Sequence, residues 1–289
     1  MKKRKYAILS IIVLISLLIL MPRDVEGDND MEIDLPDVSG NVTNLPWAKD
    51  KDFLKTQREN NADVLMSAYC TVLQNPSPEE EFNVHLAASS VSGTVVQPGE
   101  VFSQNNIIGP YTEEKGYKAG QSYIGSEIIY TIGGGVCKIA STLYNVTVSS
   151  NLEIIERYNH SMPVTYVPLG QDATVSYGSK DLKFKNNTEF PILIWAEAIE
   201  NRLYISLYGR EKPPKVEWNH KVLNKMQAPK SYITNPNLPK GEENVVVEGM
   251  EGATVKSWVT ITYENGDTKI KHLGISQYWP MPYIIETNR

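Results

Sequence analysis

Cys137 is the residue of this sequence best placed to do covalent chemistry. It follows three consecutive glycines, at 133–135, and opens a segment in which apolar residues recur with helical spacing from 139 to 146. Unpaired amides and the dipole at a helix N-terminus stabilise a thiolate, and Lys138 adds a nearby positive charge. The pattern favours a nucleophile, although a glycine turn followed by a small buried thiol has the same spacing.

A cysteine nucleophile needs a base and a group that orients the base. Of the four histidines, His160 follows the cysteine at a break in the strand pattern, where loops present side chains to a site. Asp172 comes shortly afterwards and can hold the imidazole tautomer. A solvated histidine and a turn-capping aspartate fit the same spacing, so both interpretations stay open. The cysteines and histidines lack zinc-ligand spacing, and we predict no metal or other cofactor.

The elements that must position these residues are mostly strands. Strand patterns occur at 173–177, 182–185, 191–196 and 202–208, and a hairpin at 122–132 turning at residues 125–126. Asn83 is expected to cap a short helix over 84–91. Strands around one or two helices, without βαβ alternation, predict an α+β fold.

The composition changes after the proline pair at 213–214, which predicts a domain boundary. The remainder reads as short strands, with a hairpin turn at Asn265-Gly266, and has no cluster of acid, base and thiol. We expect a binding or spacing module there. The predicted organisation is an anchor at 1–22, an acidic linker at 23–51, a main domain at 52–210 and a β module at 211–289.

The start of the chain predicts export. Basic residues at 2–5 precede an apolar run at 6–21, and no small-residue cleavage site follows. This favours an uncleaved signal anchor, hence a single-pass membrane protein with its bulk outside the cell. The formal net charge of −6 gives no electrostatic footprint for nucleic acid.

The second cysteine, Cys70, lies in an apolar run at 64–73 that should be buried. In an exported chain the two cysteines either form one disulfide or are an active thiol and a bystander. A disulfide predicts that the purified protein contains no free thiol.

The sequence around these residues resembles the VanW-like domain, a family named after an accessory protein of vancomycin B-type resistance clusters. The resemblance runs from about 82 to 210, and the motifs that carry it are Glu100-Val101-Phe102-Ser103, Gly109-Pro110, Gly133-Gly134-Gly135-Val136-Cys137, Ser141-Thr142-Leu143-Tyr144-Asn145, His160-Ser161, Gly170 and Asp172-Ala173-Thr174-Val175. The C-terminal part, around 238–241, 247–249 and 263–266, more loosely resembles the five-glycine domain, an extracellular β-module found beside cell-wall enzymes.

The resemblance implies a surface protein that acts on peptidoglycan as an L,D-transpeptidase. Cys137 would attack the carbonyl after the third residue of a stem peptide, and His160 would accept the thiol proton and protonate the leaving amine. Backbone amides near 135–138 would stabilise the oxyanion. Candidate substrate-binding or oxyanion residues within these motifs are Gly134, Gly135, Lys138, Ser141 and Tyr144.

One departure from the family pattern keeps a second interpretation open. Family members commonly read Gln-Val-Ser-Ser after the cysteine, where this chain reads Lys138-Ile139-Ala140-Ser141 and so has one hydroxyl fewer. The same cleft could bind a wall peptide or glycopeptide as a non-enzymatic scaffold. The expected partners are peptidoglycan stem peptides and the membrane, and the sequence leaves the oligomeric state open.

Overall fold

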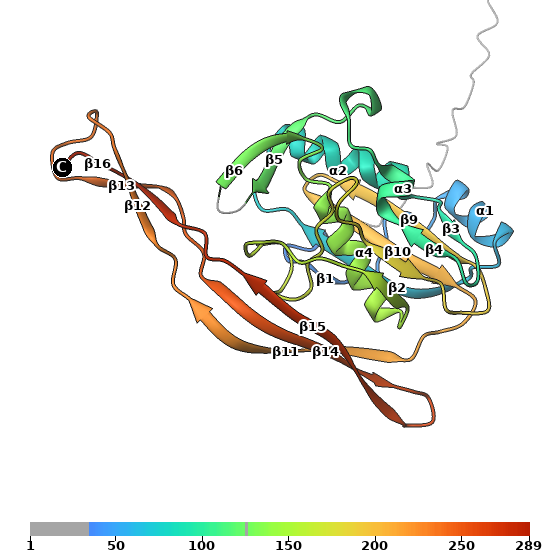
Figure 1. The fold of residues 1–289 in the computed structure, drawn as a ribbon. Coiled ribbons are helices and arrows are strands. Elements are labelled where there is room, and N and C mark those ends of the chain that lie inside the picture. Colours follow the sequence, from blue (N-terminus) through green and yellow to red (C-terminus); the bar gives the residue numbers. More distant parts are fainter. Residues whose placement is uncertain (1–34, 125–126) are drawn as a thin grey trace, which may run out of the picture. The chain divides into compact units, whose positions relative to one another are not determined.

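A computed structural model of the chain describes residues 35–124 and 127–289 (Figure 1). The predicted signal anchor, residues 1–22, and the hairpin turn predicted at 125–126 lie outside the described residues. Within the described ranges, no helix is both long and apolar enough to cross a membrane.

The centre of the fold is a five-stranded antiparallel sheet, in the order β1-β2-β10-β9-β3. Its strands are β1 (Gly40–Asn41), β2 (Val64–Val72), β3 (Val95–Val96), β9 (Ile192–Ile199) and β10 (Arg202–Gly209). Successive side chains of a strand point to opposite faces of a sheet. On β10, Leu203, Ile205 and Leu207 join one apolar cluster, while Tyr204 and Tyr208 join another. Both faces of the sheet are therefore covered.

Two helices, α2 (Pro78–Val91) and α4 (Cys137–Ser149), cover one face, and α1 (Lys51–Glu59) packs on the other (Figure 1). The helix predicted after Cys137 is confirmed as α4. It is buried on nearly every side, because the C-terminal strands close over the surface that faces away from the sheet. Thr142 is hydrogen-bonded to Thr71 of β2 at 2.7 Å, which fixes the helix along the sheet.

The segment just before α1 is part of the core, although the sequence predicted a spacer over 23–51. Trp47 is only 2% exposed, and its Nε1 donates to the Tyr208 hydroxyl at 2.9 Å. Asp50 caps α1 by accepting from the amide of Phe53. The acidic and proline-rich composition hid the apolar side chains, Leu45 and Trp47, that anchor this segment.

Helix α2 begins at Pro78, earlier than the predicted start at 84. Ser77 is the N-cap and accepts from the amide of Glu80, proline occupies the first turn, and three glutamates follow there. Asn83 is thus inside the helix. Its side chain bonds both the carbonyl and the amide of Lys118 and donates to the carbonyl of Gly134. The residue predicted as a cap instead ties the glycine turn to the helix.

The smaller elements surround α4. They are a sheet of β4 (Val101–Ser103), β8 (Lys183–Lys185) and β7 (Glu153–Glu156), a separate hairpin of β5 (Ala119–Ile124) and β6 (Glu127–Ile132), the helix α3 (Gln104–Ile108) and the short helix η1 (Glu113–Lys115). The strand predicted at 173–177 is wrong. That segment makes only isolated bridges, at Thr174 and Ser176, and runs as a loop along the start of α4.

The C-terminal module, residues 211–289, is all β. One sheet holds β11 (Lys215–Met226), β14 (Gly252–Thr262) and β15 (Thr268–Tyr278); the other holds β12 (Lys230–Thr234), β16 (Tyr283–Thr287) and β13 (Glu243–Val247). The turn predicted at Asn265-Gly266 joins β14 and β15, as expected. The fold is thus mixed α+β with a β-rich C-terminal module.

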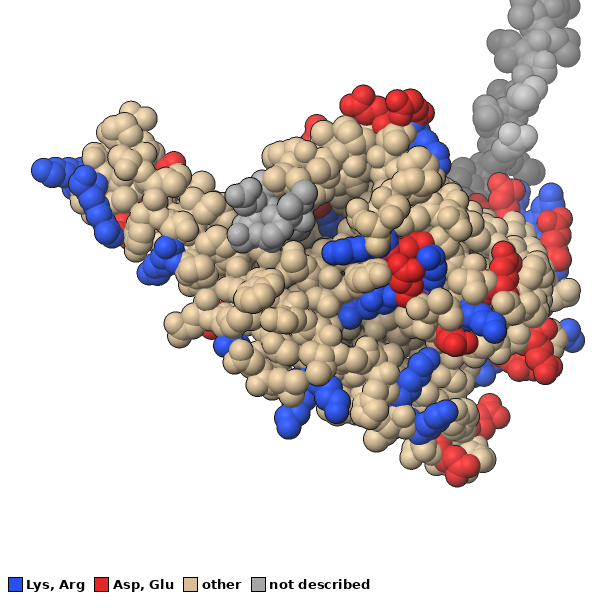
Figure 2. Space-filling model, viewed as in Figure 1, with Lys and Arg blue, Asp and Glu red and all other residues tan. Residues whose placement is uncertain are grey.

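On the face viewed in Figure 2, basic and acidic side chains are interspersed.

Candidate active site

A cleft of about 720 Å³ opens at the start of α4. Its walls come from the end of β6 and the glycine turn, from the loop at 110–112, and from two later loops at 160–166 and 174–180. Cys137 and His160 both line it. The two residues that the sequence proposed as nucleophile and base thus lie at one cavity, although 23 positions separate them in the chain.

The structure brings Cys137, His160 and Asp172 together in that order. The Cys137 thiol and the His160 imidazole are hydrogen-bonded. On the other side of the ring, Nδ1 of His160 lies 2.7 Å from Oδ2 of Asp172. The same carboxylate oxygen accepts from the backbone amide of His160 at 2.7 Å, which fixes the ring and its main chain together. This is the relation of nucleophile, base and orienting acid found in triads.

The electrostatics of the three groups favour an ion pair. Burial alone raises the pKa of the Cys137 thiol, but the hydrogen bond to His160 and the charge of its ring outweigh burial and lower the pKa to about 7. Burial lowers the pKa of His160, while bonds and charges from Asp172 and Cys137 raise it to about 9. Between these two pKa values the pair is therefore mainly thiolate and imidazolium.

The loop at 174–175 also holds the sulfur. The amide of Val175 donates to Sγ at 3.4 Å, and the Thr174 hydroxyl lies 3.4 Å from Sγ. Both contacts help to lower the thiol pKa, because they stabilise the charged form. No local pattern indicates this contact, and the segment was predicted as a strand rather than a loop.

Asp172 is buried and its carboxylate is fully bonded. Besides the two bonds from His160, Oδ1 accepts from Nη2 of Arg157 at 2.9 Å and from the hydroxyl of Tyr278 at 2.5 Å. Burial alone raises the pKa of this carboxyl, but the bonds and charges of His160 and Arg157 hold it below its usual range. Arg157 and Tyr278 were not predicted as site residues, since neither lies near the cysteine in sequence.

Lys138 lines the cleft but is not a free cation. Its side chain is buried and forms an ion pair with Glu80 of α2. Burial lowers the pKa of this amine, while the charge of Glu80 opposes that shift. The main stabilisation of the thiolate therefore comes from His160, while the lysine that the sequence suggested is paired with Glu80.

The three glycines make the turn that places Cys137. Gly133 and Gly135 have φ of +82° and +106°, a region that disfavours side chains. Gly134 packs so closely on β5 that an added Cβ would lie 2.2 Å from the backbone of Gly120. Gly135 lines the cleft, whereas Gly134 does not.

Not all the amides proposed for an oxyanion are available. Those of Val136 and Lys138 donate to the carbonyls of Gly133 and Gly135, at 3.2 and 3.0 Å. Among the described residues, no hydrogen bond engages the amides of Gly135 and Cys137. These two are the donors that the turn leaves for a ligand.

Ser141 and Tyr144 lie outside the cleft. The Ser141 hydroxyl bonds the amide and the carbonyl of Ala173, at 2.9 and 3.1 Å, and so fixes the loop that follows Asp172. Tyr144 packs edge-on against Trp218 and under the guanidinium of Arg157. The structure gives both residues contacts that support the site from beneath.

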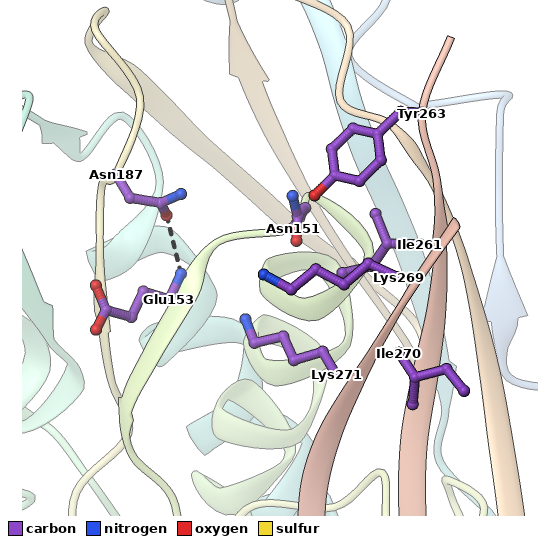
Figure 3. Close-up of a pocket in the computed structure, with 8 residues that line it drawn as sticks. All are labelled: Asn151, Glu153, Asn187, Ile261, Tyr263, Lys269, Ile270 and Lys271. Atoms are coloured by element: carbon purple, nitrogen blue, oxygen red, sulfur yellow. Dashed lines mark hydrogen bonds between the residues drawn. The ribbon is translucent and has the colours of Figure 1, made fainter. Parts of the chain in front are cut away.

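A second cavity, of about 380 Å³, lies between β7 and the hairpin of β14 and β15 (Figure 3). Lys269 and Lys271 extend into it side by side, opposite Asn151 and Glu153 (Figure 3). No cysteine or histidine lines it. The chemistry on the described part of the chain therefore points to the cleft at Cys137.

The predicted alternative of a disulfide is wrong, because Cys70 and Cys137 are both free. Cys70 is fully buried on β2, on the sheet face that packs against α1, whereas Cys137 lies at the cluster of α2 and α4. The central sheet separates the two thiols.

Comparisons with known proteins find similar sequences for both parts of the chain. Residues 79–208 match the family described as VanW like protein, and residues 219–274 match the G5 domain. The chain is 37% identical over 146 residues to the uncharacterized protein YoaR of Bacillus subtilis (strain 168), covering 50% of this chain and 48% of that protein. It is 29% identical over 137 residues to the vancomycin B-type resistance protein VanW of Enterococcus faecalis (strain ATCC 700802 / V583), covering 46% and 50%.

The chain thus spans about half the length of the curated relatives it matches. Among solved structures, the G5 domain of an IgA1 protease matches 27% of this chain and 95% of its own length, at 20% identity and a TM-score of 0.18. By the two family matches, residues 79–208 are the VanW-like part of the chain and residues 219–274 are its G5-like part.

Proposed function

We propose that this protein acts on peptidoglycan by cysteine-dependent acyl transfer of the L,D-transpeptidase type. The observation that carries the proposal is the Cys137–His160–Asp172 arrangement in the cleft, with the thiol pKa lowered to about 7 by the bond and charge of His160 against the opposing effect of burial. A thiolate in an accessible, electropositive position is what a cysteine nucleophile requires.

In the first step, the Cys137 thiolate attacks the carbonyl carbon of an amide in a stem peptide. The amides of Gly135 and Cys137 stabilise the oxyanion that forms, because both lack a partner within the described protein. The C–N bond then breaks, the leaving amine takes the proton of the His160 imidazolium, and a thioester remains. Asp172 keeps the ring in place throughout.

In the second step, an amine from a neighbouring stem attacks the thioester. Neutral His160 takes the proton of that amine, and the Cys137 thiolate leaves, which restores the starting ion pair. The raised pKa of His160, about 9 as bonds and charges from Asp172 and Cys137 outweigh burial, suits it to return to the imidazolium form. Water in place of the amine makes the same site a carboxypeptidase.

The substrate class follows from the two domains together. G5 domains are associated with cell-wall components, and one relative of the VanW-like domain is named as a vancomycin B-type resistance protein. We therefore place the protein at the outer face of the cell membrane, held by the apolar run at 6–21. Cell fractionation with and without that run tests the anchor independently of the chemistry.

The test is to incubate the full chain with muropeptides that carry tetrapeptide stems and to analyse the products by mass spectrometry. New dimers, or loss of the terminal D-alanine, should appear with the intact protein and disappear with Cys137→Ala. Cys70→Ala is the matched control and should retain activity. If the intact protein leaves the muropeptides unchanged and a carbapenem does not acylate Cys137, the enzyme proposal fails and a wall-binding scaffold replaces it.

A further inference from the structure

The C-terminal module reaches into the site of the VanW-like domain. Tyr278, at the end of β15, is fully buried, and its hydroxyl donates to Oδ1 of Asp172 at 2.5 Å. The other donor to that oxygen is Arg157, whose Nη1 also donates to Ser276 of β15 at 2.8 Å. Of the two donors to Oδ1, Tyr278 belongs to β15 and Arg157 is bonded to β15, a strand of the C-terminal module.

The segment that leads to Asp172 is shaped to fit this module. The amide of Gly170 donates to the Tyr278 hydroxyl at 2.8 Å, so the hydroxyl bridges the loop and the carboxylate. Gly170 has φ of +89°, and an added Cβ would lie 2.2 Å from Oγ of Ser257 on β14. A glycine here lets the loop approach β14 without a clash.

Further bonds hold the module against the chain on both sides of His160. The amide of Trp279 donates to the carbonyl of Ser161 at 2.7 Å, directly after the histidine. Lys271, whose side chain enters the second cavity in Figure 3, donates to the carbonyl of Leu152 at 2.9 Å. Strand β15 is thus bonded to the segment from 152 to 172 along much of its length.

We propose that Tyr278 is a positioning residue of the cleft: its hydroxyl holds the Asp172 carboxylate in the orientation that anchors His160, so that the C-terminal module completes the site of the VanW-like domain. This rests on the proposed role of Cys137 and His160 as reacting groups. It changes the interpretation of the module, which the sequence predicted only to bind or to space.

The geometry explains why one hydroxyl matters. Oδ2 of Asp172 holds His160 through two bonds, and this requires that the carboxylate does not rotate. Oδ1 is held by Arg157 and Tyr278, from two directions. Without the hydroxyl, the Gly170 amide loses its acceptor and the loop loses its link to β15. The carboxylate then relaxes, and the imidazolium beside Cys137 is less well held.

The experiment follows the thiolate without any substrate. The full chain and Tyr278→Phe are alkylated with iodoacetamide from pH 5 to 10, and the Cys137 peptide is quantified by mass spectrometry. We expect alkylation of Cys137 about tenfold slower at pH 7 in the variant and equal at pH 10, because a higher thiol pKa reduces only the thiolate fraction. A profile that superimposes on that of the parent, or that shifts to lower pH, overturns the proposal.

The direction in which the pH profile shifts distinguishes two roles of the Tyr278 hydroxyl: holding the Asp172 carboxylate in place, or only neutralising its charge. A hydroxyl that only neutralised the carboxylate would, when removed, leave Asp172 a stronger partner for the imidazolium and move the profile to lower pH. Tyr232→Phe, which removes an exposed tyrosine hydroxyl from β12, is the matched control and should leave the profile unchanged.

A second variant covers the case in which Tyr278→Phe does not fold. Ser276→Ala removes the acceptor that β15 provides for Arg157 and should shift the profile in the same direction by a smaller factor. If it leaves the profile unchanged, the proposal fails. Because no muropeptide is used, an inactive parent in the peptidoglycan assay does not affect this result.

Discussion

Two regions of the molecule each hold a free cysteine, and their surroundings give the two thiols opposite character. Cys70 lies in the middle of β2, where burial raises its pKa to about 12. Burial also raises the pKa of Cys137, but the bond and charge of His160 bring it down to about 7. Tyr204 and Arg202 act on Cys70 in the same sense as His160 acts on Cys137, yet they do not offset burial. Direct contact with the His160 imidazole therefore accounts for the difference between the two thiol pKa values.

Removing the His160 imidazolium should raise the pKa of the Cys137 thiol towards that of the Cys70 thiol. We expect His160→Ala to reduce acyl transfer by about 10²- to 10⁴-fold, because both the ion pair and the general acid are lost. Alkylation of Cys137 at pH 7 should fall with it. His85→Ala, at a half-buried histidine of α2, is the control and should keep full activity. Unchanged alkylation in His160→Ala would show that another group lowers the thiol pKa.

The pH dependence tests the same ion pair in the unaltered protein. Burial opposes the pair, but the contact between Cys137 and His160 sets their pKa values at about 7 and about 9, so the pair is populated between these limits. Below pH 7 the thiol is protonated, and above pH 9 the imidazolium has lost its proton. The transfer rate should therefore be bell-shaped, falling about tenfold per pH unit beyond each limb. A single rise near pH 9 would indicate an isolated thiol.

Lys138 tests whether a nearby positive charge affects the pKa of the Cys137 thiol as strongly as the direct contact with His160 does. Lys138→Met should destabilise the fold by about 3 kcal/mol, because Glu80 is left without its partner. The Cys137 alkylation profile should change little. Denaturant unfolding and alkylation are measured on the same preparation, and Glu80→Gln combined with Lys138→Met should recover most of the stability. A large shift of the profile would mean that the lysine, and not His160, is the main cation.

The smallest effect is expected at the other cysteine. Cys70→Ala should leave acyl transfer unchanged and lower the free energy of unfolding by about 1 kcal/mol, through lost packing in the α1 cluster. Thermal unfolding and the muropeptide assay check the two parts. Loss of activity with stability retained would contradict the bystander role of Cys70.

The parts that were predicted correctly depend on local sequence. The helical spacing after Cys137, the position of His160 at a strand break and the turn at Asn265-Gly266 are each set by a few neighbouring residues. The start of α2 also has a local signal, since Ser77 is an N-cap and Pro78 suits the first turn, although the helix was predicted to start only at 84.

The missed parts depend on contacts between distant residues. Arg157 and Tyr278 meet at Asp172 only because β15 folds back across the VanW-like domain. Lys138 is paired because α2 brings Glu80 to it. Ser141 and Tyr144 share the motif of the cysteine, but the helix turns both away from the cleft. Sequence spacing gives no information on any of these contacts.

The position of the two cysteines on opposite faces of the central sheet also bears on oxidation. A low-pKa thiolate is the form that oxidants convert to sulfenic acid, and many such thiols are protected by a resolving cysteine within reach. Here Cys70 faces the α1 cluster, behind the sheet. An oxidised Cys137 therefore has no resolving cysteine within reach, and the formation of a disulfide at this position requires an external thiol.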